Sequence, residues 1–389
     1  MRAEGYRQGV APPPAGYLDA ASGQPLNPAA REALAAAVDA GWADPVRLYR
    51  EGRRAALLLD AARESVASRV GARPADLVFT GSGAQALHLG LAGALAARPD
   101  GALVASAVEH SAALAVGDAH AAAGGEVRLV GVDRQARVDA AAFAQALPGA
   151  TVACLQAANH EVGTLQPVDQ VGRACAEAGV PLLVDASTTL GRLDPPEHWS
   201  MLTGSAHTWG GPAGVGILCV RRPTRWQPPG PQDERGPELM SVPLAVAAAR
   251  GLEWADEQRA RDAVTAKALT DQIRDVVARE VPDVMLLGDP NARLPYLTAF
   301  SCLYVDGESL VLGLDREGYA ISSGSSCVAD TRRPSHVLAA MGVLTQGNVR
   351  VSLPFGVTDE TVRGFLDTLP GVVRDIRAIV QAPGEDGGR

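Results

Sequence analysis

The sequence predicts an α/β protein with a mostly parallel sheet in a large domain and a smaller α+β domain. Short apolar runs alternate with alanine-rich helical stretches, the pattern of parallel strands covered by helices on both faces. After about residue 256 this pattern gives way to a long charged stretch. A chain of 389 residues is also too long for one ordinary core. The expected divisions are a large domain (17–256), a small domain (1–16 and 257–380) and a disordered tail (381–389).

Seven apolar runs are short enough to be strands. In chain order they are DLVFT (76–80), ALVAS (102–106), EVRLVGV (126–132), TVACLQ (151–156), VPLLVDA (180–186), MLTGS (201–205) and GVGILCV (214–220). Helical stretches such as 30–40 and 84–97 precede or separate them, and 257–280 predicts a long charged helix. Ligands of such sheets bind at the carboxyl ends of the strands. The residues that follow the runs are therefore the candidates for a site.

The composition excludes several classes of function. A net charge of −9 provides no basic field for a phosphate backbone, so direct binding of nucleic acid is not expected. The five cysteines are scattered without zinc-ligand spacing, so no metal site is predicted, and they suit a reducing cytosol. The sequence contains no signal peptide and no run of about 18 apolar residues. We expect a cytoplasmic protein that does not contact membranes.

The residues at two strand ends indicate an anion-binding turn and a functional carboxylate. DLVFT runs into Gly81, Ser82 and Gly83 before a helix near Ala84, so free backbone N–H groups and a positive helix end predict an anion site. Asp185 ends PLLVDA, where a carboxylate is either a helix cap or a functional group. A glycine turn before a helix is common, so an ordinary turn remains the alternative for the first signal.

Four further residues are candidates for a functional role, and three of them also have an ordinary structural explanation. His110 in VEHSAAL is a candidate ring platform or a capping residue, and Asn159 in AANHEVGT is a binding residue or a turn residue. Cys327 follows SSGSS in a polar loop, where a reactive thiol is plausible. Arg350 in NVRVSLPF could hold a carboxylate, or it forms a surface ion pair.

Taken together, the motifs resemble the cysteine desulfurase family of pyridoxal-phosphate (PLP) enzymes, which have the class V aminotransferase fold of PLP fold type I. The motifs are YLDAASGQP, LYREGRRAA, LVFTGSGAQA, VEHSAAL, NHEVGT, LLVDA, GSAHTWGGPAGVG, ISSGSSC and VRVSL. The resemblance runs from Tyr17 to about residue 365. It implies a homodimer with a large PLP domain and a small domain. It also implies transfer of sulfur from L-cysteine to a protein cysteine as a persulfide, and from there to an acceptor protein.

The resemblance implies roles at the cofactor. His110 matches the residue that stacks on the PLP ring, Asp185 the carboxylate that keeps the pyridine nitrogen protonated, and Asn159 the side chain near the ring oxygen and substrate. The other implied cofactor-binding residues are Ser82, Gly83, Thr188, Ser205 and His207. Cys327 matches the persulfide cysteine, and Arg350 matches the arginine that binds the substrate carboxylate.

The sequence departs from the family pattern at the catalytic lysine. Thr208 stands where the Schiff-base lysine is expected, and Lys267, in the charged helix, is the single lysine of the chain. A threonine can neither hold PLP covalently nor shuttle the substrate's Cα proton. PLP, if bound, is therefore held noncovalently. The other departures are Ala84-Gln85 in the phosphate turn, Thr188 for a glutamine, the short QDERGPELMSVP segment, and Pro354-Phe355 after the last strand.

Three hypotheses follow. The first is an altered PLP enzyme in which His207, a catalytic candidate beside Thr208, moves protons in place of lysine. The second is a sulfur carrier whose Cys327 receives sulfur from another protein. The third is a noncatalytic partner or scaffold subunit of a sulfur-transfer complex, for example one bound to a true desulfurase. The retained residues favour sulfur transfer on this fold, with weak or lost desulfurase activity of its own.

Overall fold

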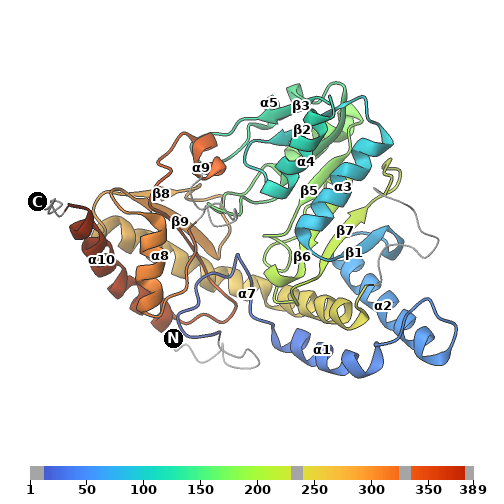
Figure 1. The fold of residues 1–389 in the computed structure, drawn as a ribbon, viewed down its shortest axis with the longest axis horizontal. Helices are drawn as coiled ribbons and strands as arrows, with labels where there is room; N and C mark the ends of the chain where they lie inside the picture. The colour runs from blue at the N-terminus through green and yellow to red at the C-terminus, as the bar shows by residue number, and fades with distance from the viewer. Residues whose placement is uncertain (1–12, 229–239, 324–333, 382–389) are drawn as a thin grey trace, which may run out of the picture.

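The large sheet of the computed structural model, which describes residues 13–228, 240–323 and 334–381, has seven strands (Figure 1). They are β1 (Leu77–Thr80), β2 (Ala102–Ser106), β3 (Val127–Val130), β4 (Ala150–Gln156), β5 (Leu182–Asp185), β6 (Met201–Ser205) and β7 (Gly216–Val220). Their order is β1-β7-β6-β5-β4-β2-β3. β7 is antiparallel to both neighbours, and the remaining pairings are parallel. The predicted mostly parallel sheet is confirmed, and each predicted run supplies one strand.

Helices cover both faces of this sheet because its strands are apolar on both faces. On β2, Leu103 and Ala105 share a core with α3 (Gly83–Ala97) and α4 (Ser111–Ala122). Val104 between them belongs to the opposite core. This alternation is the two-residue period of a strand. The opposite core includes α2 (Arg50–Arg69), α5 (Ala140–Gln145), α6 (Val168–Ala178) and the start of α7.

The helix expected over 257–280 is longer than predicted. α7 runs without interruption from Val242 to Glu280, because the chain between Gly251 and Glu280 contains neither proline nor glycine. Its first half packs in the core of the large sheet and its second half in the core of the small sheet. α1 (Pro28–Ala40) and α2 pack along it. Figure 1 shows this helix passing along both sheets. The domain boundaries given above stay predictions.

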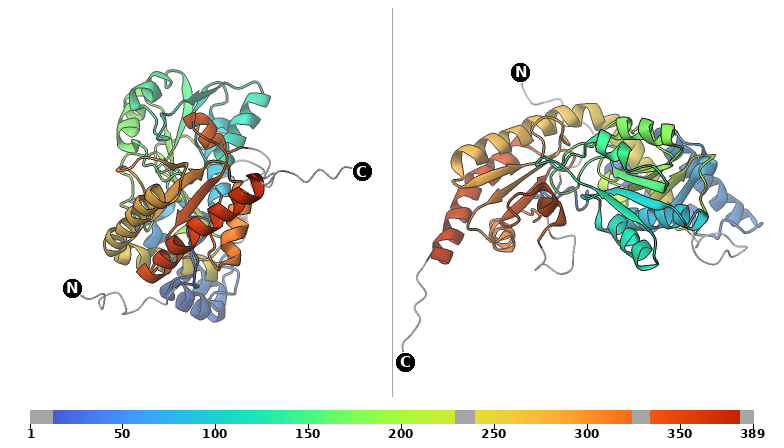
Figure 2. Two further views of the ribbon diagram at one scale, coloured as in Figure 1. Left: turned by 90° about the vertical axis from the view of Figure 1, so that its left-hand side faces the viewer. Right: turned by 90° about the horizontal axis from the view of Figure 1, so that it is seen from above.

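The small sheet has the order β10-β9-β8 and is antiparallel. Its strands are β8 (Val284–Leu287), β9 (Leu297–Cys302) and β10 (Asn348–Ser352). The helices α7, α8 (Gly307–Arg316) and α10 (Asp359–Gln381) share its core, and Figure 2 shows α10 on the outer side. A further short helix, α9 (His336–Met341), precedes β10 in the chain. Short 3₁₀ turns occur at Pro74–Asp76 and Ala206–Thr208.

Chain segments near the amino terminus are attached to the small sheet. Isolated bridges join Asp19 to Ser352 and Ser322 to Arg350. β10 therefore brings the motif that begins at Tyr17 next to Arg350 of the last strand motif. Within the described helices, none is both long enough and apolar enough to cross a membrane.

Candidate functional site

The predicted residues of the large sheet meet at one edge. β6, β5, β4 and β2 are neighbours and parallel, so their carboxyl ends lie side by side. Asp185 and Ser205 end β5 and β6, while His110 and Asn159 lie a few residues beyond β2 and β4. The geometry therefore places these four residues at one edge of the sheet, and their roles in a site stay predictions.

Asp185 is a buried carboxylate whose described hydrogen bonds all go to one of its two oxygens. It is 7% exposed, and its Oδ1 accepts hydrogen bonds from the Ser187 backbone N–H (3.0 Å), the Ser187 hydroxyl (2.6 Å) and the Thr203 hydroxyl (3.3 Å). Oδ2 takes part in no hydrogen bond among the described residues. A buried carboxylate with a fixed orientation and a free oxygen suits a cationic N–H donor.

The start of α3 differs from the prediction of free N–H groups. Ser82 is the N-cap and accepts from the Gln85 N–H (3.0 Å), while the Gln85 side chain accepts from the Gly81 N–H (2.5 Å). The Gly83 N–H donates to the Ser205 hydroxyl at 3.4 Å. The Ser82 cap, the Gln85 side chain and the neighbouring Ser205 thus each occupy one of the expected donors. The prediction is wrong for these three groups.

Gly83 also holds the start of α3 close to the end of β6. A Cβ added at Gly83 would lie 2.8 Å from the Cβ of Ser205 and 3.1 Å from the Ser187 hydroxyl oxygen. Only glycine allows this approach without displacing its neighbours. The position therefore fixes the distance between the helix start and the two strand-end loops.

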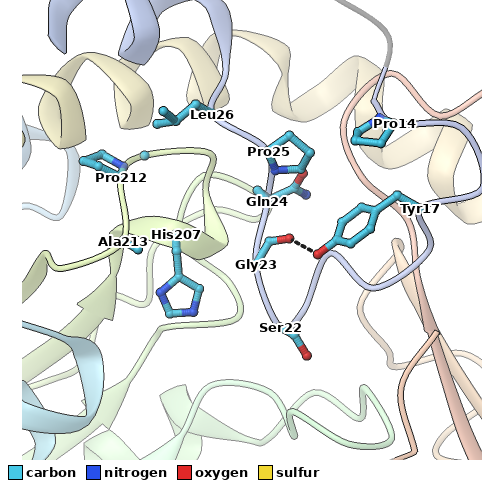
Figure 3. Close-up of a pocket in the computed structure, with 11 residues that line it drawn as sticks. Pro14, Tyr17, Ser22, Gly23, Gln24, Pro25, Leu26, His207, Pro212 and Ala213 are labelled. Atoms are coloured by element: carbon cyan, nitrogen blue, oxygen red, sulfur yellow. Dashed lines mark hydrogen bonds between the residues drawn. The ribbon is translucent and has the colours of Figure 1, made fainter. Parts of the chain in front are cut away.

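Ser205 and His207 form a polar pair at the mouth of an open cleft. The Ser205 hydroxyl oxygen and His207 Nδ1 are 2.9 Å apart. Burial lowers the pKa of His207, so the imidazole is neutral at physiological pH. His207 borders a cleft of about 730 Å³ whose other lining residues include Tyr17, Ser22, Gln24 and Pro212 (Figure 3). The cleft connects the β6 loop with the segment that begins at Tyr17.

Thr208, at the expected lysine position, links two loops by hydrogen bonds. It is 6% exposed, and its hydroxyl lies 2.5 Å from the carbonyl oxygen of Ser187 and 2.7 Å from that of Ser205. The single hydroxyl proton can be donated to either carbonyl. Thr208 thereby connects the loops that follow β5 and β6. Lys267 is about half exposed on α7 and pairs with Asp271 at 2.7 Å, so it supplies no amine to these loops.

His110 and Asn159 have local partners. His110 is the N-cap of α4, where its Nδ1 accepts from the Ala112 N–H at 3.1 Å. Its ring centroid lies 5.2 Å from that of His160. Asn159 is fully buried, and its Oδ1 accepts from the N–H groups of Glu161 (3.0 Å) and Val162 (2.9 Å). Both alternatives, cap and turn, describe these contacts, and the cofactor roles stay predictions.

Thr188 lies in the loop after β5 and is 9% exposed. Its hydroxyl donates to the Ala158 carbonyl at 3.2 Å, and its own carbonyl accepts from the Tyr296 hydroxyl at 2.8 Å. Thr188 thus attaches this loop to the β4 loop and to the small sheet's side of the molecule. Its predicted contact with a cofactor stays a prediction.

Arg350 is buried in β10 with protein partners. It is 2% exposed, and Nη2 donates to the Asp19 carboxylate (2.8 Å) and the Ser22 hydroxyl (2.6 Å), while Nη1 donates to the His160 carbonyl (3.0 Å). The surface ion pair considered from the sequence is therefore a buried one. Its partner, Asp19, lies in the first of the motifs.

Comparisons with known proteins identify the family. The model of the family described as aminotransferase class-V matches residues 17–232 and 239–365. The chain belongs to the aminotransferase class-V family. Within it, the relatives found are cysteine desulfurases, so the resemblance to the cysteine desulfurase family is confirmed.

Three comparisons show how extensive this similarity is. A cysteine desulfurase from Cereibacter sphaeroides is 33% identical, covering 93% of this chain and 97% of the relative. An IscS-like cysteine desulfurase from Mycobacterium tuberculosis is 34% identical, covering 95% and 99%. The solved structure of a NifS-like protein matches with a TM-score of 0.85 at 25% identity, covering 93% and 100%. The fold of this class V member is therefore PLP fold type I.

The structure shows two buried titratable residues, next in sequence to predicted site residues, that the sequence motifs did not single out. Glu109, beside His110, is fully buried; its Oε1 accepts from the Gln156 N–H at 3.1 Å, and burial raises its pKa to about 8. Burial, with smaller contributions from His110 and Arg350, holds the pKa of His160 well below its ordinary value. Glu109 precedes His110 in VEH, and His160 follows Asn159 in NHE. Their position next to predicted site residues is the one feature of the sequence that could have pointed to them.

Cys327 lies outside the described residues. The described chain on either side of it is attached to the site: Ser322 exchanges backbone hydrogen bonds with Arg350, and the Ser335 hydroxyl donates to Glu161 at 2.5 Å. Glu161 is 4% exposed, and burial raises its pKa to about 7. The described residues on either side of this segment, Ser322 and Ser335, are therefore both attached to residues near the strand ends.

Proposed function

We propose that this protein is a sulfur-transfer protein of the cysteine desulfurase type. Cys327 carries sulfur as a persulfide, and desulfurase turnover by the protein itself is weak or lost. One observation carries the proposal: the candidate site keeps a carboxylate, a serine and histidines, but no lysine amine reaches it. The Thr208 hydroxyl instead links the loops after β5 and β6, and Lys267 pairs with Asp271 on α7. The similarity to cysteine desulfurases supports the sulfur chemistry.

The residues present fit the ring of PLP without a covalent link. The free Oδ2 of Asp185 suits a protonated ring nitrogen, and the partly exposed His110 follows β2, which β4 separates from β5 at the same edge of the sheet. Ser205 and His207 would hold the phosphate. When bound, PLP supplies a conjugated ring that accepts an electron pair from substrate. Without a positioned lysine as acid and base, a loss of roughly 10²–10⁴-fold in rate is expected.

The other cysteines are poor sulfur carriers. Cys154, Cys175, Cys219 and Cys302 are all buried. Burial raises the pKa of Cys175 and Cys219 to about 12 and that of Cys302 to about 11, and raises that of Cys154 as well. The thiolate is the nucleophile, so these thiols are unreactive near neutral pH. Cys327, in its polar sequence context, is therefore assigned the persulfide.

Replacing Cys327 by serine is expected to abolish persulfide formation. The purified protein is incubated with a persulfide donor, and the added sulfur is located by mass spectrometry of peptides. The wild-type protein should gain one sulfur atom on Cys327, while C327S should gain none. Cys302→Ser, which removes a buried thiol, is the matched control and should label like the wild type. Equal labelling of C327S would overturn the carrier role.

The same experiment separates the alternatives. Labelling of Cys327 by L-cysteine and PLP alone would favour an enzyme in which the neutral His207 moves protons. Labelling only by a persulfide donor supports the carrier. Failure of Cys327 to accept sulfur from any donor would favour a noncatalytic partner of a sulfur-transfer complex.

We also propose that the protein is a homodimer, as its family relationship implies. An exposed apolar surface surrounds the connection between α1 and α2 and comprises Val38, Trp42, Val46, Leu48, Tyr49 and Leu57, each at least half exposed. It lies in the dark blue region at the lower right of Figure 1. Large apolar side chains exposed in one short part of the chain are a signal of a protein interface.

The double substitution Trp42→Asp and Leu48→Asp is expected to convert the dimer to a monomer, because two charges would be buried at the interface. Light scattering after gel filtration measures the mass. Ile379→Asp, at a 76% exposed residue on α10, is the control and should leave the mass unchanged. A dimeric double variant would place the interface elsewhere.

A further inference from the structure

The side chain of Glu109 is a fully buried carboxyl group that contacts no cation among the described residues. Its Oε1 accepts a hydrogen bond from the Gln156 N–H at 3.1 Å, and its Oε2 lies 3.8 Å from the Cys154 sulfur. These are its hydrogen-bond partners within the described chain. One backbone N–H and one thiol do not replace the hydration of an ionised carboxylate, so such a group keeps its proton instead.

The titratable groups around Glu109 come from β4, β5, α4 and α9. Burial, with a smaller contribution from Asp185 at the end of β5, raises the pKa of Glu109 to about 8. Cys154 on β4 is itself fully buried, and burial raises the pKa of its thiol, so it stays protonated. His336 directs its Nε2 to the Glu109 backbone carbonyl (2.9 Å), and His110 uses its Nδ1 to cap α4. Neither histidine therefore pairs with the carboxyl group.

Glu109 lies in the loop between β2 and α4 (107–110), which also carries His110. The loop is attached to β4 through Gln156 in two ways. The Gln156 N–H donates to the Glu109 carboxyl group, and the Gln156 side chain donates to the Val108 carbonyl at 2.5 Å. An ionised Glu109 would place a buried negative charge at the first of these contacts, and it could regain hydration only if the loop moved away from β4.

We propose that Glu109 is a positioning residue that holds the loop of residues 107–110 against β4 as a neutral carboxylic acid, and that release of its proton to solvent at alkaline pH loosens this loop. The inference goes beyond the proposed function and rests on it only for the role of His110 at the cofactor. The orientation of His110 at the edge of the sheet thereby depends on one proton that is buried next to it in the chain.

The proton on Glu109 makes the stability of the fold depend on pH. The folded protein keeps this proton up to about pH 8, whereas the unfolded chain loses it near the ordinary pKa of 4.5. Its contribution is therefore present in full below pH 4.5 and is lost as the pH rises through about 8. Glu109→Gln has a neutral side chain of the same shape at every pH. Between pH 5 and 9 its folding equilibrium constant should gain roughly 10²–10³-fold relative to that of the wild type.

Urea titration of the full-length protein at a series of pH values measures this gain in the absence of PLP and of any sulfur donor. Glu317→Gln makes the same chemical change at an exposed residue at the end of α8, so it is the matched control and should follow the wild type. Parallel pH curves for the wild type and Glu109→Gln would overturn the inference, because the carboxyl group would then not be held neutral.

Hydrogen exchange followed by mass spectrometry tests whether the loop itself responds. At pH 9 the peptide that contains residues 107–112 should exchange at least about tenfold faster in the wild type than in Glu109→Gln, and at pH 6 the two proteins should exchange alike. A peptide from β9, in the small sheet, should differ less between them. If 107–112 differs no more than β9 does, the effect belongs to overall stability and the role in holding the loop is overturned.

A measurement on proteins that keep Glu109 covers the case in which Glu109→Gln does not fold. Glutamate carboxyl groups labelled with carbon-13 are titrated by NMR, and one signal should titrate near pH 8. Burial also raises the pKa of Glu161, to about 7, so the titration is repeated with Glu161→Gln. If every glutamate of that variant titrates in the ordinary range, the inference is overturned. Since none of these measurements involves Cys327, its failure and that of the proposed function are distinguishable.

Discussion

Replacing Thr208 by lysine is expected to convert reversible binding of PLP into covalent retention. The free oxygen of Asp185 and the Ser205–His207 pair remain in place to orient the cofactor, and the new amine would stand at the position where the sequence motif led us to expect the lysine. The variant should keep a visible absorbance band through gel filtration, and borohydride should fix the cofactor to the peptide that contains residue 208.

Thr208→Met is the matched control, because methionine has a similar length and no amine. Both variants lose the hydroxyl contacts to the Ser187 and Ser205 carbonyls, so both should be destabilised by about 1–3 kcal/mol. A folded lysine variant that retains no cofactor would show that the phosphate end has also changed. The occupied N–H groups of Gly81, Gly83 and Gln85 would then be the first cause to examine.

Replacing Asp262 by alanine is expected to destabilise the protein by about 3–5 kcal/mol, because it leaves the Arg192 guanidinium buried without its carboxylate. Arg192 is 2% exposed and donates to Asp262 at 2.6 Å and to the Leu353 carbonyl at 3.1 Å. Its guanidinium carbon lies 3.6 Å from the ring centroid of Phe355 and 4.4 Å from that of Tyr296. This cluster joins the loop after β5 to α7 and to the end of β10.

The free energy of unfolding is measured by urea titration. Asp60→Ala, which breaks the exposed pair with Arg63, is the control and should cost less than about 1 kcal/mol. Combining Arg192→Met with Asp262→Leu should recover part of the loss, since no buried charge remains. A cost for Asp262→Ala no greater than that of the control would mean that Arg192 finds another partner.

Phe355 shows how a departure from the family pattern can gain a role in packing. The sequence has Pro354 and Phe355 where the resemblance led us to expect a glycine and an arginine. In the structure the Phe355 ring lies under Arg192 and contacts Trp254 edge-on, with ring centroids 5.3 Å apart. Sequence comparison marks such a position as a loss, because the compensating partner is more than a hundred residues away.

The sequence by itself determined the large sheet and the ends of its strands. Strands such as ALVAS and TVACLQ are continuous apolar runs because both faces are covered, and that pattern is local. Since parallel strands end at the same edge, Asp185, Ser205, His110 and Asn159 could be brought together without coordinates. The absence of a lysine beyond Lys267 is likewise a property of the sequence alone.

Only the tertiary structure decided which polar groups are already in use. The Arg350 guanidinium donates to Asp19, 331 residues earlier in the chain. The Gly83 N–H donates to Ser205, 122 residues later. A sequence shows that a side chain can donate or accept a hydrogen bond, but a hydrogen bond requires two groups at about 3 Å. Residues distant in the chain reach that separation only when the whole fold is formed.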